Sequence, residues 1–366
     1  MLQSLSCRDG RRVRDGIAGR RNSEVTPMDS MKAIVFHTAK DIDSLTIEDV
    51  PRPEPGPEEV LVRIRAAALN HRDVWITQGL YPGIKLPGIL GSDGAGEVVA
   101  VGEEVDDRWL ERSVVINPSL DWGPDMRAQQ AAFRILGMPD SGTQAQYVAV
   151  PEGNVMEMPA HMSFEHAAAI PLGGVTGYRA LFTQGGLMSG ETALVTGIGG
   201  GVASLMAQMV LACGARLIAT SSSEAKLKQI DHPRYLGGAL YTDENWGKKA
   251  RELAGEDGID LIVDSAGGDT LNDYVDVVNP GGRIVFFGAT RGNPSGLNLR
   301  KIFWKQITIQ GTTMGHEQDF EHMIRLFEKQ QVLPIIDGPY PMKDFRKAYQ
   351  RMIDGAQTGK IVLTID

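Results

Sequence analysis

Apolar and polar positions change their pattern along the chain. From Met31 to about residue 151, short alternating apolar runs are broken by Gly and Pro, which is typical of β-strands joined by turns. After residue 192, apolar runs alternate with helix-length amphipathic segments, as in strands and helices wound into one parallel sheet. The pattern therefore predicts a β-rich, barrel-like domain followed by an α/β domain.

The α/β part contains six apolar runs that predict buried parallel strands, with helices between them on both faces of the sheet. The tail GKIVLTID has no place among these six strands, and we expect it to rejoin the β-rich domain. A short helix capped by Ser163 precedes the α/β part, and an amphipathic helix covers 319–331. The predicted strands are 193–195, 217–219, 239–242, 259–264, 283–288 and 307–311.

These elements divide the chain into an interrupted β-rich domain, at 31–173 and 316–366, and an inserted α/β domain at 174–315. Residues 1–30 carry six arginines against four acids and almost no apolar periodicity, which predicts a disordered extension. The acids argue against a transit peptide and favour a translated upstream extension, with the working start at Met28 or Met31.

Charge and cysteine content narrow the function classes. The net charge of −9 disfavours nucleic acid or an anionic membrane as partner, and no apolar run is long enough to span a membrane. Only Cys7 and Cys213 are present, so one chain can build neither a disulfide framework nor a cysteine-rich zinc site. We therefore expect a cytoplasmic protein that acts on a small molecule.

A glycine-rich turn joins the first predicted strand to a helix-length segment. Gly197, Gly199, Gly200 and Gly201 let the backbone bend and let a pyrophosphate approach the helix N-terminus. Ala203 stands where a small residue packs helix on strand. The context predicts a dinucleotide site; the alternative is an ordinary strand-to-helix turn.

The end of the second strand indicates which nicotinamide cofactor binds. An NAD site places a carboxylate there, whereas this strand ends in Thr220, Ser221, Ser222 and Ser223, with Lys226 one helical turn later. This predicts NADPH. Three acids nearby leave NADH as the alternative, namely Glu224, Asp243 and Glu244.

The motifs together resemble the medium-chain dehydrogenase/reductase superfamily, and within it the quinone oxidoreductase (zeta-crystallin-like) branch. The resemblance covers Met31 to Asp366, and it implies a GroES-like catalytic domain with an inserted Rossmann domain. The chain departs from the branch's glycine signature at Ile198 and Ala203. The matching motifs are ALNHRD, GxYP, GSDGAGEVVAVG, GTQAQYV, AAIPLGGVTGY, GIGGGVA, VDSAGG, GGRIVFFGAT, IQGTTMG and GKIVL.

Zinc alcohol dehydrogenases of the same superfamily hold a metal with Cys, His and Cys. The matching positions here are Asn70, Ser92 and Leu172, which do not form a zinc ligand set. The resemblance therefore implies hydride transfer to a substrate that needs no metal, a quinone or an α,β-unsaturated carbonyl. The alternatives are a zinc-type alcohol dehydrogenase relative and a non-catalytic cofactor-binding homologue.

The resemblance also implies the catalytic residues. Asn70, Asp73 and Tyr81 line the catalytic side of the cleft, with Asn70 as donor to the substrate oxygen and Tyr81 as proton source, and Thr176 faces the nicotinamide. Alternatively, Asn70 satisfies a loop backbone, Asp73 pairs with Arg72, and Tyr81 packs in a turn.

Strand ends and the returning C-terminal strand complete the cofactor site that the resemblance implies. Lys360 is expected to approach the pyrophosphate, and the unpaired edge of the sixth strand favours a homodimer. The implied cofactor contacts are Thr176, Gly197, Gly199, Gly200, Gly201, Val202, Ala203, Ser221, Ser222, Lys226, Ser265, Ala266, Gly267, Phe287, Gly288, Ala289, Thr290, Thr312, Met314 and Lys360.

Overall fold

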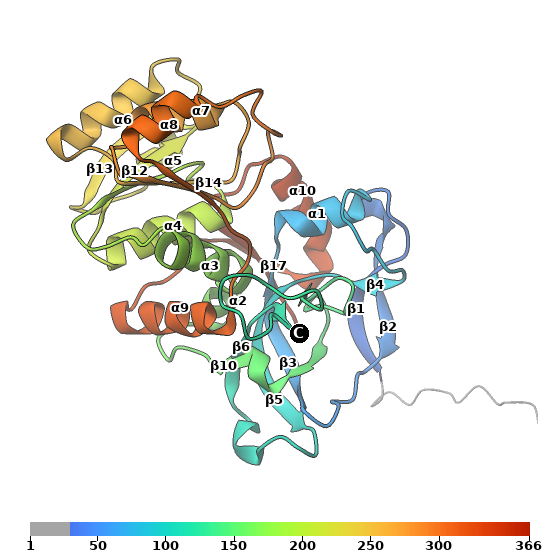
Figure 1. Cartoon of the computed structure of the whole chain (residues 1–366). Coiled ribbons are helices and arrows are strands. Elements are labelled where there is room, and N and C mark those ends of the chain that lie inside the picture. Colours follow the sequence, from blue (N-terminus) through green and yellow to red (C-terminus); the bar gives the residue numbers. More distant parts are fainter. Residues whose placement is uncertain (1–29) are drawn as a thin grey trace, which may run out of the picture.

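Two lobes, each built on its own large sheet, account for the change in apolar pattern along the chain (Figure 1). The computed structural model describes residues 30–366. The predicted disordered extension lies outside the described residues, apart from Ser30, which begins the first strand.

The first lobe contains a seven-stranded sheet in which β3 is central. Along one edge, β3 pairs antiparallel with β9 at its first residues and with β18 at its last residues. Along the other edge, β3 pairs antiparallel with β5. The strand order is β10-β6-β5-β3-β18-β17. The strands are β3 Glu59–Ala68, β5 Asp93–Val101, β6 Ser113–Ile116, β9 Tyr147–Pro151, β10 Val155–Glu157, β17 Ile336–Pro341 and β18 Lys360–Thr364.

Two small sheets and three helices complete this lobe. The chain reaches it again through β17 and β18, so the C-terminal segment lies beside strands from the first hundred residues. The remaining strands are β1 Ser30–Phe36, β2 Leu45–Pro51, β4 Gly88–Ile89, β7 Ser119–Leu120 and β8 Arg134–Ile135. The helices are α1 His71–Thr77, α2 Phe164–Ala168 and α10 Phe345–Ile353.

The second lobe is a six-stranded sheet in the order β13-β12-β11-β14-β15-β16, and all of its strand pairs are parallel. This confirms the predicted Rossmann sheet. The strands are β11 Thr192–Val195, β12 Arg216–Ser221, β13 Tyr235–Leu240, β14 Leu261–Asp264, β15 Arg283–Phe286 and β16 Thr308–Gly311.

Successive side chains along these strands point to opposite faces of the sheet, and helices cover both faces to form a core on each. Ala193 and Val195 pack with apolar residues of α4 and α9, whereas Leu194 packs with α6 and α7 on the other face. The helices are α3 Pro171–Tyr178, α4 Gly201–Ala212, α5 Glu224–Leu227, α6 Trp246–Ala254, α7 Thr270–Val277, α8 Leu299–Lys305 and α9 Glu317–Gln330.

Helix α1 and strand β17 are among the elements that the pattern does not predict. Residues after Asn70 form helix α1, not a loop, and Asn70 is its N-cap. Strand β17 contains Gly338 and Pro339, which shift its register against β18, and it lies at the sheet edge where proline is tolerated. Among residues 30–366, no helix is long and apolar enough to cross a membrane.

Candidate active site

A cavity of about 430 Å³ is lined by residues of both lobes. The first lobe contributes the start of α1 and of β18, and the second contributes the glycine turn and the ends of its strands. The charged or titratable side chains along its wall are His71, Arg72, Tyr81 and Lys360, and among residues 30–366 no carboxylate lines it. The cavity is therefore suited to anionic or electron-rich ligands, although the protein as a whole is acidic.

The glycine turn leaves the N-terminus of α4 open to the cavity. Gly197 has φ +66°, and Gly197, Gly200 and Gly201 all line the cavity wall. A Cβ on Gly201 would come within 2.6 Å of the Lys360 stem, and one on Gly199 within 2.7 Å of the Lys226 stem. Glycine thus leaves room for the close approach of two lysine side chains to a turn that fits a phosphate.

Ile198 and Ala203, the two departures from the branch's glycine signature, lie in different surroundings. Ile198 is buried in the core below the turn, and its N–H donates to the Thr220 carbonyl at 2.9 Å, so its side chain leaves the turn open. Ala203 lines the cavity together with Val202. Neither residue distorts the strand-to-helix geometry.

Strand ends form the opposite wall. Ser265, Phe287, Gly288, Thr290, Thr313 and Met314 line the cavity at these strand ends, and Thr176 of helix α3 lines it as well. The buried carboxylate of Asp264 shapes this wall by accepting hydrogen bonds from the N–H groups of Ala266 (2.9 Å) and Gly267 (2.7 Å). Ala266, Gly267, Ala289 and Thr312 belong to the same loops but do not line the cavity.

Ser221, Ser222 and Lys226 lie at the end of β12 and the start of α5, beyond the cavity wall. The ammonium of Lys226 donates to the carbonyls of Gln357 (2.8 Å) and Gly355 (3.3 Å). Glu224, the acid that complicated the choice of cofactor, pairs with Lys228 at 3.0 Å on the exposed side of α5.

Two side chains near the end of β12 were missed. Tyr241 directly follows β13, and its N–H donates to the Ser221 carbonyl at 3.1 Å. The Arg291 guanidinium lies 5.7 Å from the centre of the Tyr241 ring. Arg291 comes from the loop after β15, about 70 residues from Ser221, so local spacing gave no signal for it.

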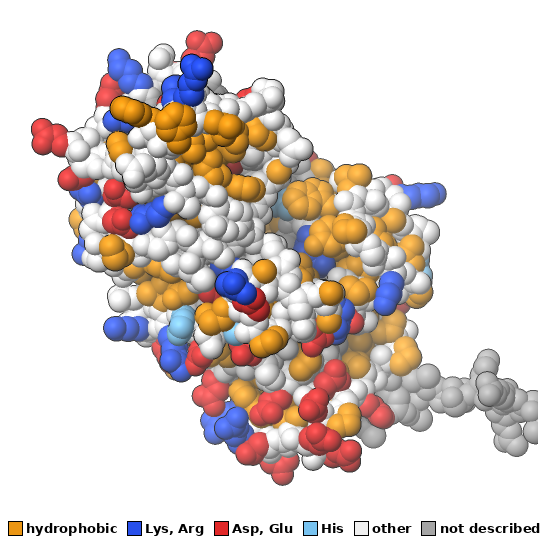
Figure 2. All heavy atoms as spheres, viewed as in Figure 1, with side chains coloured by type: hydrophobic (Ala, Val, Ile, Leu, Met, Phe, Trp, Pro, Cys, Tyr) orange, Lys and Arg blue, Asp and Glu red, His pale blue; other side chains and the backbone are white. Residues whose placement is uncertain are grey.

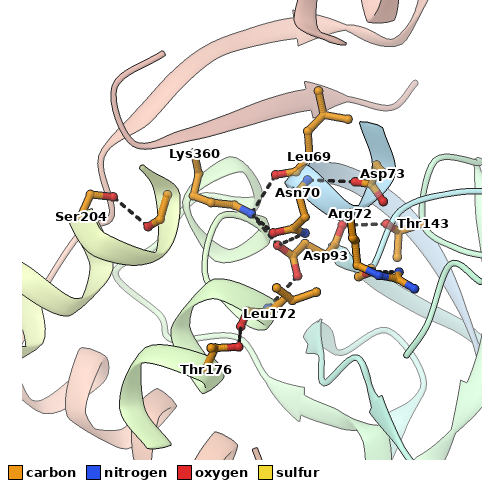
Figure 3. Close-up of polar contacts among 12 residues, drawn as sticks. Leu69, Asn70, Arg72, Asp73, Asp93, Thr143, Leu172, Thr176, Ser204 and Lys360 are labelled. Carbon is orange, nitrogen blue, oxygen red and sulfur yellow. Dashed lines mark hydrogen bonds and ion pairs between the residues drawn. The ribbon is translucent and has the colours of Figure 1, made fainter. Parts of the chain in front are cut away.

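A buried polar cluster lies where the two lobes meet (Figure 3). The Lys360 ammonium donates to Asn70 Oδ1 at 2.7 Å and to Asp93 Oδ2 at 2.8 Å. Asn70 Nδ2 donates to the same Asp93 oxygen at 2.9 Å, and the Leu172 N–H donates to the other oxygen at 2.7 Å. Asp93, which is not among the site residues that the resemblance implies, therefore holds elements of both lobes together.

This cluster decides where Lys360 points. Its methylene stem borders Gly201 of the phosphate turn, but its ammonium also donates to the Leu69 carbonyl at 2.9 Å and so has three acceptors away from the turn. The structure thus places the Lys360 charge beside Asn70 rather than beside the expected pyrophosphate position. Asp93 attracts that charge into the first lobe.

Asp73 is fully buried behind the cavity and does not line it. Its Oδ2 accepts from the Asn70 backbone N–H at 2.8 Å, which caps α1, while Oδ1 has no hydrogen-bond partner. Burial raises the pKa of Asp73 to about 6, against the opposing influence of Arg72. The structure therefore separates Asp73 from the side chains that line the cavity.

Arg72 and Tyr81 lie together in the part of the cavity wall that the first lobe contributes. The Arg72 guanidinium is 4.9 Å from the centre of the Tyr81 ring, and it donates to Ser92 Oγ at 2.6 Å and to the Leu136 carbonyl at 2.9 Å. Arg72 therefore does not hydrogen-bond to Asp73, contrary to the alternative considered from the sequence. Apolar side chains flank this part of the wall, namely Trp75, Ile135 and Leu172.

His71, the first residue of α1, also lines the cavity. The pKa of its ring lies below the ordinary value, because the surrounding protein disfavours the charged form and because the Lys360 charge opposes protonation, although part of the side chain is exposed. His71 therefore reaches the cavity in its neutral form at neutral pH.

Comparison with known proteins identifies the two lobes. The family model of the alcohol dehydrogenase GroES-like domain matches residues 56–160, and that of zinc-binding dehydrogenases matches 201–329. The chain is 32% identical over 330 residues to the zinc-type alcohol dehydrogenase-like protein YogA of Leptosphaeria maculans, covering 86% of this chain and 92% of the relative.

Other relatives carry different activities in their names. The chain is 30% identical to a quinone oxidoreductase of Pseudomonas aeruginosa, covering 91% of this chain and 99% of the relative. A crystal structure of an NAD-dependent alcohol dehydrogenase superposes with a TM-score of 0.86 at 35% identity, covering 92% of this chain and all of that one. The comparisons thus include both alcohol dehydrogenases and a quinone reductase.

Proposed function

Since the chain belongs to the medium-chain dehydrogenase/reductase superfamily, we propose that it is a zinc-independent, NADPH-dependent reductase of quinones or α,β-unsaturated carbonyls. It is an oxidoreductase that uses a pyridine nucleotide. Beyond this, we propose that the enzyme works without zinc, that it reduces quinones or enones, and that it prefers NADPH.

The observation that carries the proposal is the presence of cations at the positions where a zinc site would lie. Asn70 Oδ1 accepts from the Lys360 ammonium and Ser92 Oγ accepts from the Arg72 guanidinium, so both candidate oxygen ligands already face positive charge. Leu172 contributes only a backbone N–H to this cluster. Zinc does not fit there, because it would lie close to two cations and would lack nitrogen or sulfur ligands.

Without a metal to polarise it, the substrate must already be electrophilic. In a quinone or an enone, conjugation spreads the incoming electron pair onto oxygen, so the protein needs only to orient the reactants and donate hydrogen bonds to that oxygen. Bound NADPH supplies a hydride, whose electron pair forms the new C–H bond at the β-carbon of the enone or at the quinone.

The side chains around the cavity fit the remaining tasks. The Asn70 amide lies at the wall and can donate to the substrate oxygen, and the Tyr81 hydroxyl is the proposed source of the proton that completes the reduction. The Arg72 guanidinium, 4.9 Å from the centre of the Tyr81 ring, helps to hold that ring at the cavity wall. Overall, one hydride and one proton are added across the conjugated system, and NADPH becomes NADP⁺.

The environment of β12 supports NADPH over NADH. Glu224 is drawn outward by Lys228, so it does not supply the carboxylate that would repel a 2′-phosphate. Ser222, Lys226, Tyr241 and Arg291 offer hydroxyl and cationic donors around the same strand end.

Initial rates on three substrates test the proposal. A small quinone and 2-cyclohexenone with NADPH should be reduced faster than ethanol is oxidised with NADP⁺ or NAD⁺. A preference for ethanol would support the alcohol dehydrogenase alternative. Saturable NADPH binding, followed by nicotinamide fluorescence, with no turnover of any substrate would support the non-catalytic alternative.

We also propose a cytoplasmic homodimer that uses the free edge of the six-stranded sheet. Strand β16 ends the sheet, and an exposed apolar surface lies beside it on α8 (Figure 2), where Leu299, Phe303 and Trp304 are 67%, 68% and 81% exposed. A second copy that pairs with β16 and covers these side chains would remove both features from water.

A further inference from the structure

The side-chain amide of Asn70 is held between two charges of opposite sign, and both charges are buried. Lys360 is 3% exposed and Asp93 is fully buried, and their side chains are 2.8 Å apart. An ammonium only donates hydrogen bonds and a carboxylate only accepts them. The amide oxygen must therefore face Lys360 and the amide nitrogen must face Asp93, as the structure has them (Figure 3).

We infer that Lys360 and Asp93 are positioning residues that fix the orientation of the Asn70 amide, so that an N–H donor rather than a carbonyl is presented to the cavity. One hydrogen on Nδ2 is used by Asp93, and the second is free for a ligand in the cavity that Asn70 lines. The catalytic purpose of this arrangement rests on the proposed function, because a reduced carbonyl or quinone oxygen gains negative charge.

The opposite orientation of the amide is strongly disfavoured. It would place the amide oxygen against the Asp93 carboxylate and the NH₂ group against the Lys360 ammonium, so two attractive contacts would become repulsive in a site shielded from water. Lys360 cannot turn away without cost, since its three acceptors, Leu69 O, Asn70 Oδ1 and Asp93 Oδ2, match its three hydrogens.

The arrangement also explains why the donor is in place before a substrate arrives. Asn70 caps α1, Asp93 begins β5, Lys360 begins β18, and the Leu172 N–H near the start of α3 holds the second Asp93 oxygen. Four elements thus fix one amide. A donor that needs no reorganisation during the reaction stabilises developing charge more than a mobile one.

The orientation can be measured without catalysis by NMR of protein labelled with ¹⁵N at asparagine. The side-chain NH₂ signal that is missing from Asn70→Asp belongs to Asn70. We expect one of its protons to be shifted downfield and protected from exchange by the charge-assisted bond to Asp93, and this shift to disappear in the double variant Lys360→Met/Asp93→Asn. If the wild-type protein shows no such proton, the inference is overturned.

Kinetics test the consequence of the orientation. The double variant removes both charges together and so leaves no unpaired buried ion. With 2-cyclohexenone we expect kcat to fall about 100-fold, as for the loss of one oxyanion donor, while KM and the NADPH dissociation constant change by less than about threefold. The single variant Lys360→Arg keeps a cationic donor beside Asn70. Its kcat should therefore lie between that of the wild type and that of the double variant.

A matched control is available in the second lobe. Arg179 and Asp319 form another buried ion pair, 2% and 3% exposed and 2.8 Å apart, and neither lines the cavity. Arg179→Met/Asp319→Asn should lower thermal stability but keep kcat. Equal kcat losses in both double variants, or an unchanged kcat in a folded Lys360→Met/Asp93→Asn protein, would overturn the positioning role.

The two proposals fail separately. A wild-type protein that reduces no quinone or enone but shows the shifted Asn70 proton refutes the proposed substrate class and leaves the amide orientation standing. A protein that reduces enones without that proton keeps the proposed function and refutes the positioning role.

Discussion

Replacing Asp73 by asparagine separates a structural role of this carboxyl from a catalytic one. Asp73 accepts from the Asn70 backbone N–H at 2.8 Å and is completely buried, so the amide oxygen of Asn can take over the cap without a buried charge. We expect Asp73→Asn to keep kcat with 2-cyclohexenone within about threefold of wild type, because Asp73 does not reach the cavity wall.

The same change should alter how stability depends on pH. Burial raises the pKa of Asp73 from 3.8 to about 6, so between these values the folded state holds a proton that the unfolded state has lost. The free energy of unfolding therefore falls as pH rises from about 4 to about 6 and then levels off. The full loss is about 3 kcal/mol, from about 2 pKa units at 1.36 kcal/mol each.

Urea denaturation of both proteins at about pH 4.5 and about pH 7.5 measures this loss. Since asparagine does not titrate, the gain in stability of Asp73→Asn over wild type should be larger at the higher pH by about 2 kcal/mol. A gain that is equal at both pH values would show that folding does not raise the pKa of Asp73. A kcat about 100-fold lower in the folded variant would restore Asp73 to the catalytic residues.

Three further outcomes follow from the proposed function. Purified protein should contain far less than one zinc per chain and keep its activity in a chelator; stoichiometric zinc, with activity lost to the chelator and restored by zinc, would contradict the proposal. Lys226→Ala should weaken NADPH binding about 10- to 100-fold, from the loss of a charge-assisted bond of roughly 1.5–3 kcal/mol, and leave NADH almost unchanged. Lys32→Ala, which removes an exposed lysine of β1 paired with Asp49, is its control, and equal losses for both cofactors would refute the assignment. Phe303→Glu/Trp304→Glu should shift sedimentation from dimer to monomer without loss of fold, and an unchanged sedimentation coefficient would reject α8 as part of the interface.

The order of elements and the nucleotide-binding turn could be predicted from the sequence. Strands β11 and β14 are buried at every position, so they appear as continuous apolar runs, and Gly197 stands where the backbone needs positive φ. These are local properties, because each depends on residues close together in the chain. The same reasoning failed at β17, whose pairing with β18 is decided by the sheet and not by its Gly338-Pro339 pair.

The chemistry of the cavity depended on contacts between distant residues. The family resemblance implied that Asn70, Tyr81 and Thr176 lie near the cavity. Asn70 and Lys360, however, are 290 positions apart, and no local pattern indicates that the Lys360 ammonium reaches the Asn70 amide. Asp73 lies three residues from Asn70, and the resemblance implies that both line the catalytic side of the cleft, but the turn of α1 directs the Asp73 carboxylate into the core.

The sequence by itself determined the fold and the kind of cofactor, because apolar periodicity and glycine positions act over a few residues. Only the tertiary structure decided which groups meet at the site. Burial and charge pairing act through space, so it is the return of β18 beside β3 that brings Lys360 to Asp93 and Asn70 and fixes the amide between them.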